Sequence, residues 1–195
     1  MAGVMFRNPK PAPHSSVDER ARRTRMALSM ALVKLGADKP VDDITVGELA
    51  KCAGIGRSTF YAHFPDMGAF LAASYANMLA SLVERATAED PSQVIAGKYV
   101  LAHVYSARDF AGAIQNSRER PRMLAAGEAR LRIVVEANLK RLAPTLAPED
   151  RRNSAVFVVG GFMGILRHWM EGGLREPPEK VRAACEDLCQ RVLAG

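Results

Sequence analysis

A short run around residue 60 carries the side chains best suited to binding a polyanion. Arg57, Tyr61 and His63 lie close together in the sequence, and at about 100° per residue they flank a face opposite the apolar Phe60 and Phe64. The Arg57 guanidinium offers paired donors that match guanine O6 and N7, whereas Tyr61 and His63 suit phosphate oxygens. The candidate DNA-contacting residues are Thr45, Arg57, Ser58, Thr59, Tyr61 and His63.

Each of these side chains also has a simpler explanation. An arginine on a helix is usually a solvated charge, a lone histidine usually fills a structural role, and Tyr61 can cover the junction between two helices. The DNA-binding interpretation is favoured because the polar residues follow a turn built from small residues.

Two short helices and a tight turn are predicted to position this face. Thr45 is a good N-cap, and Glu48 three residues later completes a capping box. Its hydroxyl and backbone N–H, at a helix start, can also face a phosphate. Gly54 can adopt the positive φ that a turn after a helix needs, and Gly56 can begin the second helix. A helix-turn-helix is predicted, whose second helix can enter the major groove.

The same segment resembles the tetracycline-repressor (TetR) family of transcriptional regulators. The residues that carry the resemblance are Thr24-Arg25, Leu35-Gly36, Ile44-Thr45-Val46, Glu48-Leu49-Ala50, Ala53-Gly54-Ile55, Thr59-Phe60-Tyr61, His63-Phe64 and Leu71. The resemblance implies an all-α fold, with a three-helix DNA-binding head and a six- or seven-helix effector-binding and dimerisation body. It also implies that the six candidate residues face DNA, and that a homodimer represses transcription until a small effector releases it.

The chain departs from the family pattern at three places. Family members commonly carry a Lys shortly after the Phe64 position, where this chain has Asp66-Met67-Gly68. A basic or polar residue is frequent where Gly47 stands, and a Ser is usual where Gly56 stands.

The rest of the chain is also predicted to be helical, from apolar spacing and from proline and glycine boundaries. The predicted helices cover about 17–35, 66–88, a segment that could start near Pro91, 121–142, 149–171 and 178–193. The predicted domains are a disordered basic tail (1–16), a helix-turn-helix domain (17–65) and a ligand-binding and dimerisation domain (66–195).

The body is expected to hold a pocket for a small apolar or aromatic effector. The candidate lining residues are Tyr75, Met78, Tyr105, Phe110, Met123, Phe162 and Trp169, with His103, Arg108 and His168 as candidate polar anchors. Ordinary core is the simpler explanation for each lining residue. By the same resemblance, the last two predicted helices form the dimer interface, where Gly160 and Gly164 would allow close approach or serve packing within one subunit.

Two other functions stay open at this stage. Cys185 and Cys189 lie four residues apart on the last predicted helix and suggest a redox or metal sensor. Two thiolates make an incomplete metal site, so small buried hydrophobes explain them more simply. The third hypothesis is a helical interaction protein or enzyme that kept the head as a scaffold.

Charge and motifs narrow the remaining classes. The net charge is +6, and residues 1–65 hold ten Lys and Arg against six Asp and Glu, which favours a polyanionic partner. No long apolar run suggests a secretory signal or a membrane span, so a cytoplasmic location is expected. No phosphate-binding loop, zinc-protease motif or nucleophile elbow is present, so we expect no enzyme activity, no cofactor and no metal site.

Overall fold

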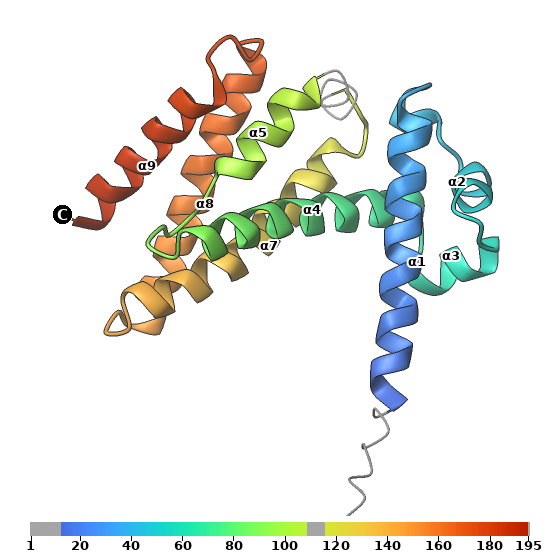
Figure 1. Ribbon diagram of the computed structural model, residues 1–195, viewed down its shortest axis with the longest axis horizontal. Helices are drawn as coiled ribbons and strands as arrows, with labels where there is room; N and C mark the ends of the chain where they lie inside the picture. Colours follow the sequence, from blue (N-terminus) through green and yellow to red (C-terminus); the bar gives the residue numbers. More distant parts are fainter. Residues whose placement is uncertain (1–12, 109–115, 195) are drawn as a thin grey trace, which may run out of the picture.

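The computed structural model describes residues 13–108 and 116–194, and all regular structure within them is helical (Figure 1). The elements are α1 (Pro13–Gly36), the 3-10 helix η1 (Val41–Asp43), α2 (Val46–Cys52), α3 (Arg57–His63), α4 (Met67–Glu89), α5 (Lys98–Ser106), α7 (Arg120–Leu142), α8 (Pro148–Glu171) and α9 (Pro178–Ala194). The predicted all-α fold is confirmed. None of the described helices combines the length and apolar character that crossing a membrane requires.

The first three α-helices form a head around a shared apolar core. Leu28 of α1, Leu49 of α2 and Phe60 of α3 are fully buried there, together with Val41 of η1. Burial of side chains of this size stabilises a fold by about 1.5–3 kcal/mol each. The head therefore owes its shape to the apolar spacing that the sequence shows.

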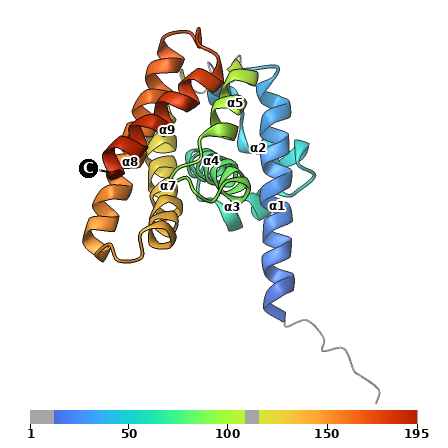
Figure 2. The ribbon, with the colours of Figure 1, turned by 60° about the vertical axis from the view of Figure 1, so that its left-hand side comes forward.

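Helix α4 belongs to both the head and the body. Phe70 and Leu71, near its start, complete the core of the head, whereas Leu79 and Val83 lie in the core of the body. In the body, α4 packs along α7, α7 along α8, and α5 against α9. Figure 2 looks nearly along α4, with α8 and α9 on one side and α1 on the other.

A glycine sets how closely α4 and α7 approach. A Cβ added to Gly127 of α7 would lie 2.8 Å from a ring carbon of Tyr75 and 2.9 Å from a methyl carbon of Leu79. Both distances are shorter than a Cβ tolerates, so any other residue at 127 would force Tyr75, Leu79 or the helices themselves to shift.

Helix α1 begins at Pro13, earlier than the predicted Val17. A proline suits the first helical position because its missing N–H needs no partner there. The rest of the predicted tail, residues 1–12, lies outside the described residues.

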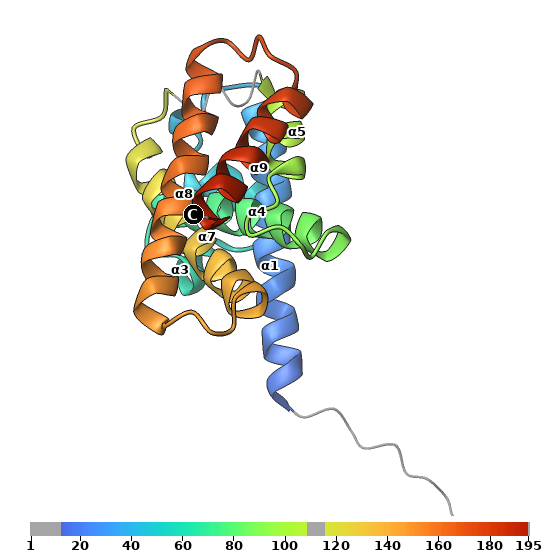
Figure 3. The same cartoon turned by 90° about the vertical axis from the view of Figure 1, so that its left-hand side faces the viewer.

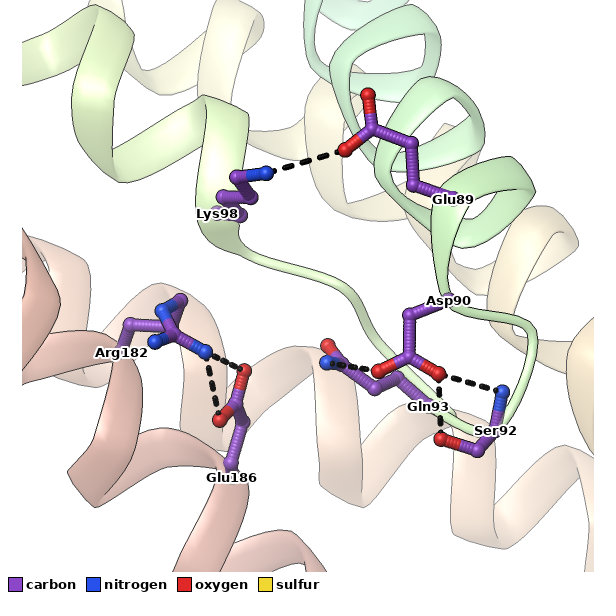
Figure 4. A network of polar contacts seen from close by, with 7 residues as sticks. All are labelled: Glu89, Asp90, Ser92, Gln93, Lys98, Arg182 and Glu186. Atoms are coloured by element: carbon purple, nitrogen blue, oxygen red, sulfur yellow. Dashed lines mark hydrogen bonds and ion pairs between the residues drawn. The ribbon is translucent and has the colours of Figure 1, made fainter.

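The predicted helix start near Pro91 is wrong, because α5 begins at Lys98. The Asp90 carboxylate accepts hydrogen bonds from the Ser92 backbone N–H at 3.1 Å and from the Gln93 side-chain amide at 2.8 Å (Figure 4). Such side-chain bonds to the following residues hold a turn.

Candidate nucleic-acid interface and body cavity

Helix α2 starts at a complete capping box. The Thr45 hydroxyl accepts a hydrogen bond from the Glu48 backbone N–H at 3.2 Å, and Glu48 Oε2 accepts one from the Thr45 backbone N–H at 2.9 Å. Lys39 Nζ donates to Glu48 Oε1 at 2.7 Å. Lys39 and the two Thr45 donors together lower the pKa of Glu48 to about 2. The predicted cap is confirmed, and it fixes where α2 begins.

The turn and the inner face of α3 also follow the prediction. Gly54 adopts a φ of 69°, a conformation that side chains with a Cβ rarely take. Phe60 and Phe64 point inward, and their rings meet the ring of Phe70 from α4 at centroid distances of 5.9 and 5.2 Å. Such aromatic pairs contribute about 0.5–1.5 kcal/mol each beyond their buried area. The three rings anchor α3 to the start of α4.

The outer face of α3 is polar and largely free. Arg57, Ser58 and Tyr61 are exposed, whereas Thr59 and His63 are half-buried. Helices α2 and α3 lie on the far side of α1 from α5, α8 and α9 (Figure 1). Helices α5, α8 and α9 therefore do not cover the exposed side chains of α3.

Two aromatic members of this face also support the helix itself. The Tyr61 ring meets the Phe60 ring edge-on at 5.4 Å, and the His63 ring lies 6.3 Å from that of Phe64. Each ring thus contacts the ring of the preceding or following phenylalanine, while Tyr61 remains 49% exposed.

Thr45 is not free in the way that the sequence suggested. Both of its donors, the backbone N–H and the hydroxyl, are bonded to Glu48 Oε2, at 2.9 and 2.7 Å. A phosphate could accept from these groups only by displacing that carboxylate. The position of Thr45 is exposed, but its hydrogen bonds serve the capping box.

A narrow cavity of about 80 Å³ lies in the body between α4, α5, α7 and α8. Its apolar walls include Met78, Leu79, Val104, Leu124, Met163 and Met170. Its polar side chains are Tyr75, His103, Arg120, Glu128 and Arg167. Burial, and then the nearby Glu128 carboxylate, raise the pKa of Tyr75 to about 12, so its hydroxyl stays protonated at neutral pH.

The structure places only some of the predicted pocket residues at this cavity. Tyr75, Met78 and the candidate anchor His103 line it. Phe162 packs instead against Gly97, where an added Cβ would lie 2.6 Å from its ring. Phe110 lies outside the described residues.

Three further predicted pocket residues contribute to packing rather than to the cavity wall. The rings of Tyr105 and Trp169 stack at 6.1 Å with an angle of 7° between them, and the indole N–H of Trp169 donates to the Glu176 carbonyl at 2.9 Å. Met123 of α7 is buried in the core of the head. The other two candidate anchors are exposed: Arg108 lies 5.7 Å from the centre of the Tyr105 ring, and His168 is on the surface of α8.

The charged members of the cavity were not predicted from the sequence. Arg120, Glu128 and Arg167 come from helices α7 and α8, and nothing in their local sequence separates them from ordinary surface charges. Gly127 was the available signal, because an isolated glycine in a helical pattern often marks a close approach.

Two family models match the chain. Residues 31–73 match the model described as bacterial regulatory proteins of the tetR family, and residues 89–191 match one described as a transcriptional regulator C-terminal region. The second match alone spans more than half of the chain. The chain belongs to the TetR family. The resemblance predicted from the sequence is thereby confirmed, and the protein is a DNA-binding transcriptional regulator.

Solved structures agree with the TetR fold. A TetR transcriptional regulator from Rhodococcus sp. RHA1 has a TM-score of 0.59 at 15% identity, covering 89% of this chain and 97% of its own. RolR without ligand gives 0.54 at 20% identity, with coverages of 84% and 89%. A putative transcriptional regulator from Pseudomonas aeruginosa PAO1 gives 0.52 at 17%, with coverages of 91% and 92%. No curated protein sequence matches the chain.

The TetR-family body presents an apolar strip on α8. Val156 is 53% exposed and Phe157 62%. A Cβ added to Gly160 or Gly164 would meet no atom within 4 Å, so these glycines do not serve packing between the described helices. Figure 3 shows α8 and α9 on the face of the molecule that lies away from the head. Leu188 of α9 is also exposed there.

A short stretch of the body, Ser117–Met123, contacts the head at several points, and we call it the connecting segment. The Ser117 hydroxyl donates to Asp42 Oδ1 at 2.6 Å, and the Arg118 backbone N–H donates to Asp42 Oδ2 at 2.9 Å. These two donors, the backbone N–H first, lower the pKa of Asp42. Met123 completes the apolar core of the head. The connecting segment thus links the two parts by both polar and apolar contacts.

The same segment explains the departure from the family pattern at residues 66–68. Asp66 caps α4 by accepting from the Ala69 backbone N–H at 2.6 Å, and it accepts from Arg122 Nη1 at 2.9 Å. A Cβ on Gly68 would overlap the Glu119 carboxylate and lie 2.6 Å from Arg122 Nη1. This chain therefore uses the positions after Phe64 to join α4 to the connecting segment.

The two C-terminal cysteines occupy a weakly reactive setting. Burial raises the pKa of Cys185 to about 11, and burial likewise raises the pKa of Cys189. Thiols become nucleophiles and metal ligands as thiolates, so both are held in the less reactive form. Among the described residues, no group of three or more His, Cys, Asp or Glu side chains is arranged to hold a metal ion.

Proposed function

We propose that this regulator is a ligand-responsive repressor that binds a pseudo-palindromic operator as a homodimer and is released by a small effector. The observation that carries the proposal is the connecting segment, which lines the body cavity through Arg120 and bonds to the head through Ser117 and Arg118. A change at the cavity can therefore reach the head through this stretch of chain.

At the DNA, α3 enters the major groove with its N-terminal end leading. Arg57 reads a guanine through paired hydrogen bonds, and Ser58 and Thr59 bond to base edges or phosphates. Tyr61 and His63 contact phosphates at the groove walls. Thr45 contributes to DNA binding indirectly, because its capping box fixes where α2 begins. We keep the predicted division into a helix-turn-helix domain (17–65) and a ligand-binding and dimerisation domain (66–195), with α4 contributing to both cores.

The homodimer forms through α8 and α9. The exposed Val156, Phe157 and Leu188 supply apolar surface, and the bare backbone at Gly160 and Gly164 lets a second α8 come close. A twofold axis through this face brings two heads to half-sites about one helical turn of DNA apart. A dimer through this face would remove these apolar side chains from water.

The effector binds in the body cavity and favours a different separation of the heads. The ligand must widen the cavity, because about 80 Å³ is smaller than the roughly 150 Å³ of a protein cavity that accepts benzene. Widening moves α4 and α7, both of which contact the head. A ligand that prefers the widened state lowers the affinity of the protein for DNA, if DNA prefers the state with the narrow cavity. By thermodynamic linkage, DNA lowers the affinity of the protein for the ligand by the same factor.

The Cys185 and Cys189 sensor is not favoured. The raised pKa of each thiol opposes both oxidation and metal binding. Replacing both cysteines with Ser is expected to leave DNA binding and its response to ligand unchanged.

Selection of duplexes from a random library, followed by sedimentation of the selected complex, tests the proposal. We expect the enriched sequence to be a pseudo-palindrome with half-sites about 10 base pairs apart, and the complex to contain two protomers or a multiple of two. Enrichment of a single asymmetric site bound by one protomer would contradict it.

A further inference from the structure

The body cavity has many hydrogen-bond donors and few acceptors. Tyr75, His103, Arg120 and Arg167, which carry N–H or O–H groups, are among its lining residues, whereas Glu128 is the one carboxylate among them. The Tyr75 hydroxyl remains a donor at neutral pH because its pKa is raised to about 12. The polar end of a matching ligand therefore carries acceptors.

The two guanidiniums at the cavity are incompletely paired. Arg120 Nη2 lies 3.8 Å from Glu171 Oε1, which is longer than a hydrogen bond. Arg167 is exposed at the cavity edge, and none of the ion pairs among the described residues includes it. A planar guanidinium binds a carboxylate through two parallel hydrogen bonds, so a ligand carboxylate would satisfy donors that the protein leaves available.

Glu128 is the one lining residue with a negative charge, and it would attract a cationic ligand rather than a carboxylate. Among the lining residues, two permanently charged guanidiniums stand against one carboxylate, so the lining carries one net positive charge. Glu171, outside the lining, lies 3.8 Å from Arg120 Nη2 and offsets part of that charge. A positive cavity lined with apolar walls attracts an anion more than a cation.

The shape of the cavity points to a slim, flexible ligand. Three of its wall residues are methionines, Met78, Met163 and Met170, whose unbranched side chains adapt to what they contact. Its small volume excludes a rigid ring system unless the wall moves, whereas an alkyl chain can enter as the methionines repack.

We propose that the cavity binds a small amphipathic carboxylic acid, with its alkyl part among the three methionines and its carboxylate at Arg120 and Tyr75. This inference rests on the proposed function and deepens it by naming the chemical class of the effector. Arg120 belongs to the connecting segment, between Arg118, which bonds to Asp42 of the head, and Arg122, which bonds to Asp66 at the start of α4. A carboxylate that draws Arg120 toward the cavity therefore acts on the segment that holds the head.

Calorimetric titration of the full chain, without DNA, tests this assignment with three probes that share one alkyl chain: sodium octanoate, 1-octanol and octylammonium chloride. We expect octanoate to bind at least about ten-fold more tightly than octanol, as a charge-assisted hydrogen bond predicts. Octylammonium is expected to bind more weakly than either. Tightest binding by octylammonium, or no binding of octanoate at millimolar concentration, would overturn the proposal.

Variants locate the carboxylate. Arg120→Gln and Tyr75→Phe should each weaken octanoate binding several-fold and leave octanol binding unchanged, whereas Arg132→Gln, on the same helix but outside the cavity, should change neither. Circular dichroism verifies that each variant is folded. An Arg120→Gln protein that is folded and binds octanoate like wild type contradicts the proposal. This titration contains no DNA, so its failure would overturn the assignment of the ligand and say nothing about operator binding. Failure of the protein to bind any operator, in a separate experiment, would overturn the proposed function.

Discussion

Ser117 of the body and Asp42 of the head are joined by a hydrogen bond of 2.6 Å, although 75 positions separate them in the sequence. The Arg118 backbone N–H donates to the other oxygen of the same carboxylate at 2.9 Å. Ser117 is one of two buried polar residues among those described, the other being Asn138. The carboxylate of Asp42 therefore contributes to the orientation of the head on the body with both of its oxygens, alongside the apolar contacts of Met123 and α4.

Asp42→Asn should loosen this joint. The amide presents an N–H₂ group to one of two donors, so either the Ser117 hydroxyl or the Arg118 N–H loses its acceptor. We expect the free energy of unfolding in urea to fall by about 1–2 kcal/mol. The control is Asp38→Asn, at an exposed residue of the loop before η1. This substitution should change the free energy of unfolding by less than about 0.5 kcal/mol. Equal effects of the two substitutions would contradict the role of Asp42.

The contribution of Asp42 should also depend on pH. Its pKa in the folded protein lies below its usual value of 3.8 because Arg118 and Ser117 donate to the carboxylate. A carboxyl group with a lowered folded pKa stabilises the fold fully above its unfolded pKa and loses that effect as the pH falls through the folded value. The difference in unfolding free energy between wild type and Asp42→Asn should hold between about pH 5 and 8 and shrink below about pH 4. A difference that grows on acidification would contradict the assignment.

Gly127→Ala should separate α4 from α7. Its Cβ would meet the Tyr75 ring at 2.8 Å, and such overpacking typically costs about 1–3 kcal/mol. Gly47→Ala in α2 is the matched control, since its Cβ meets only Thr45 Oγ1, at 3.9 Å. The control should leave stability unchanged or raise it, because alanine favours helices. Thermal unfolding of both variants checks this, and a Gly127→Ala protein as stable as wild type would show that the crossing is not tight.

Phe157→Glu should dissociate the homodimer. Phe157 is 62% exposed on α8, and two charges facing each other across a twofold axis oppose association. Sedimentation velocity at micromolar concentration should show a monomer. Met30→Glu, at an equally exposed apolar residue of α1 (69%), is the control and should remain a dimer. If Met30→Glu dissociates and Phe157→Glu does not, the interface lies on the head rather than on α8.

The head could be predicted from the sequence because its determinants are local. The Thr45 and Glu48 cap, the positive φ of Gly54 and the inward Phe60 and Phe64 depend on residues within a few positions of each other. Short-range hydrogen bonds and helical spacing decide such features, and both can be read directly from the order of residues.

The cavity and the connecting segment could not be predicted in the same way. Arg120 and Arg167 reach one cavity from two helices, and their local sequences are those of surface arginines. Large aromatic residues were better guides to the core than to the cavity: Phe162 and Trp169 fill space between helices, and Met123 reaches the head. Which apolar residue lines a cavity depends on how helices cross, and Gly127 was the one local sign of that crossing.

Fluorescence anisotropy of a labelled duplex from the DNA just upstream of the gene for this protein tests the central claim most directly. Wild type should bind tightly and lose affinity steeply as salt rises, because bound phosphates release counterions. Arg57→Ala should weaken binding by about 1–3 kcal/mol, the worth of a bidentate base contact. Arg141→Ala, which removes the same charge from an exposed site on α7, should bind like wild type. Equal binding by wild type and Arg57→Ala, with no dependence on salt, would contradict the assignment of α3 as the recognition helix.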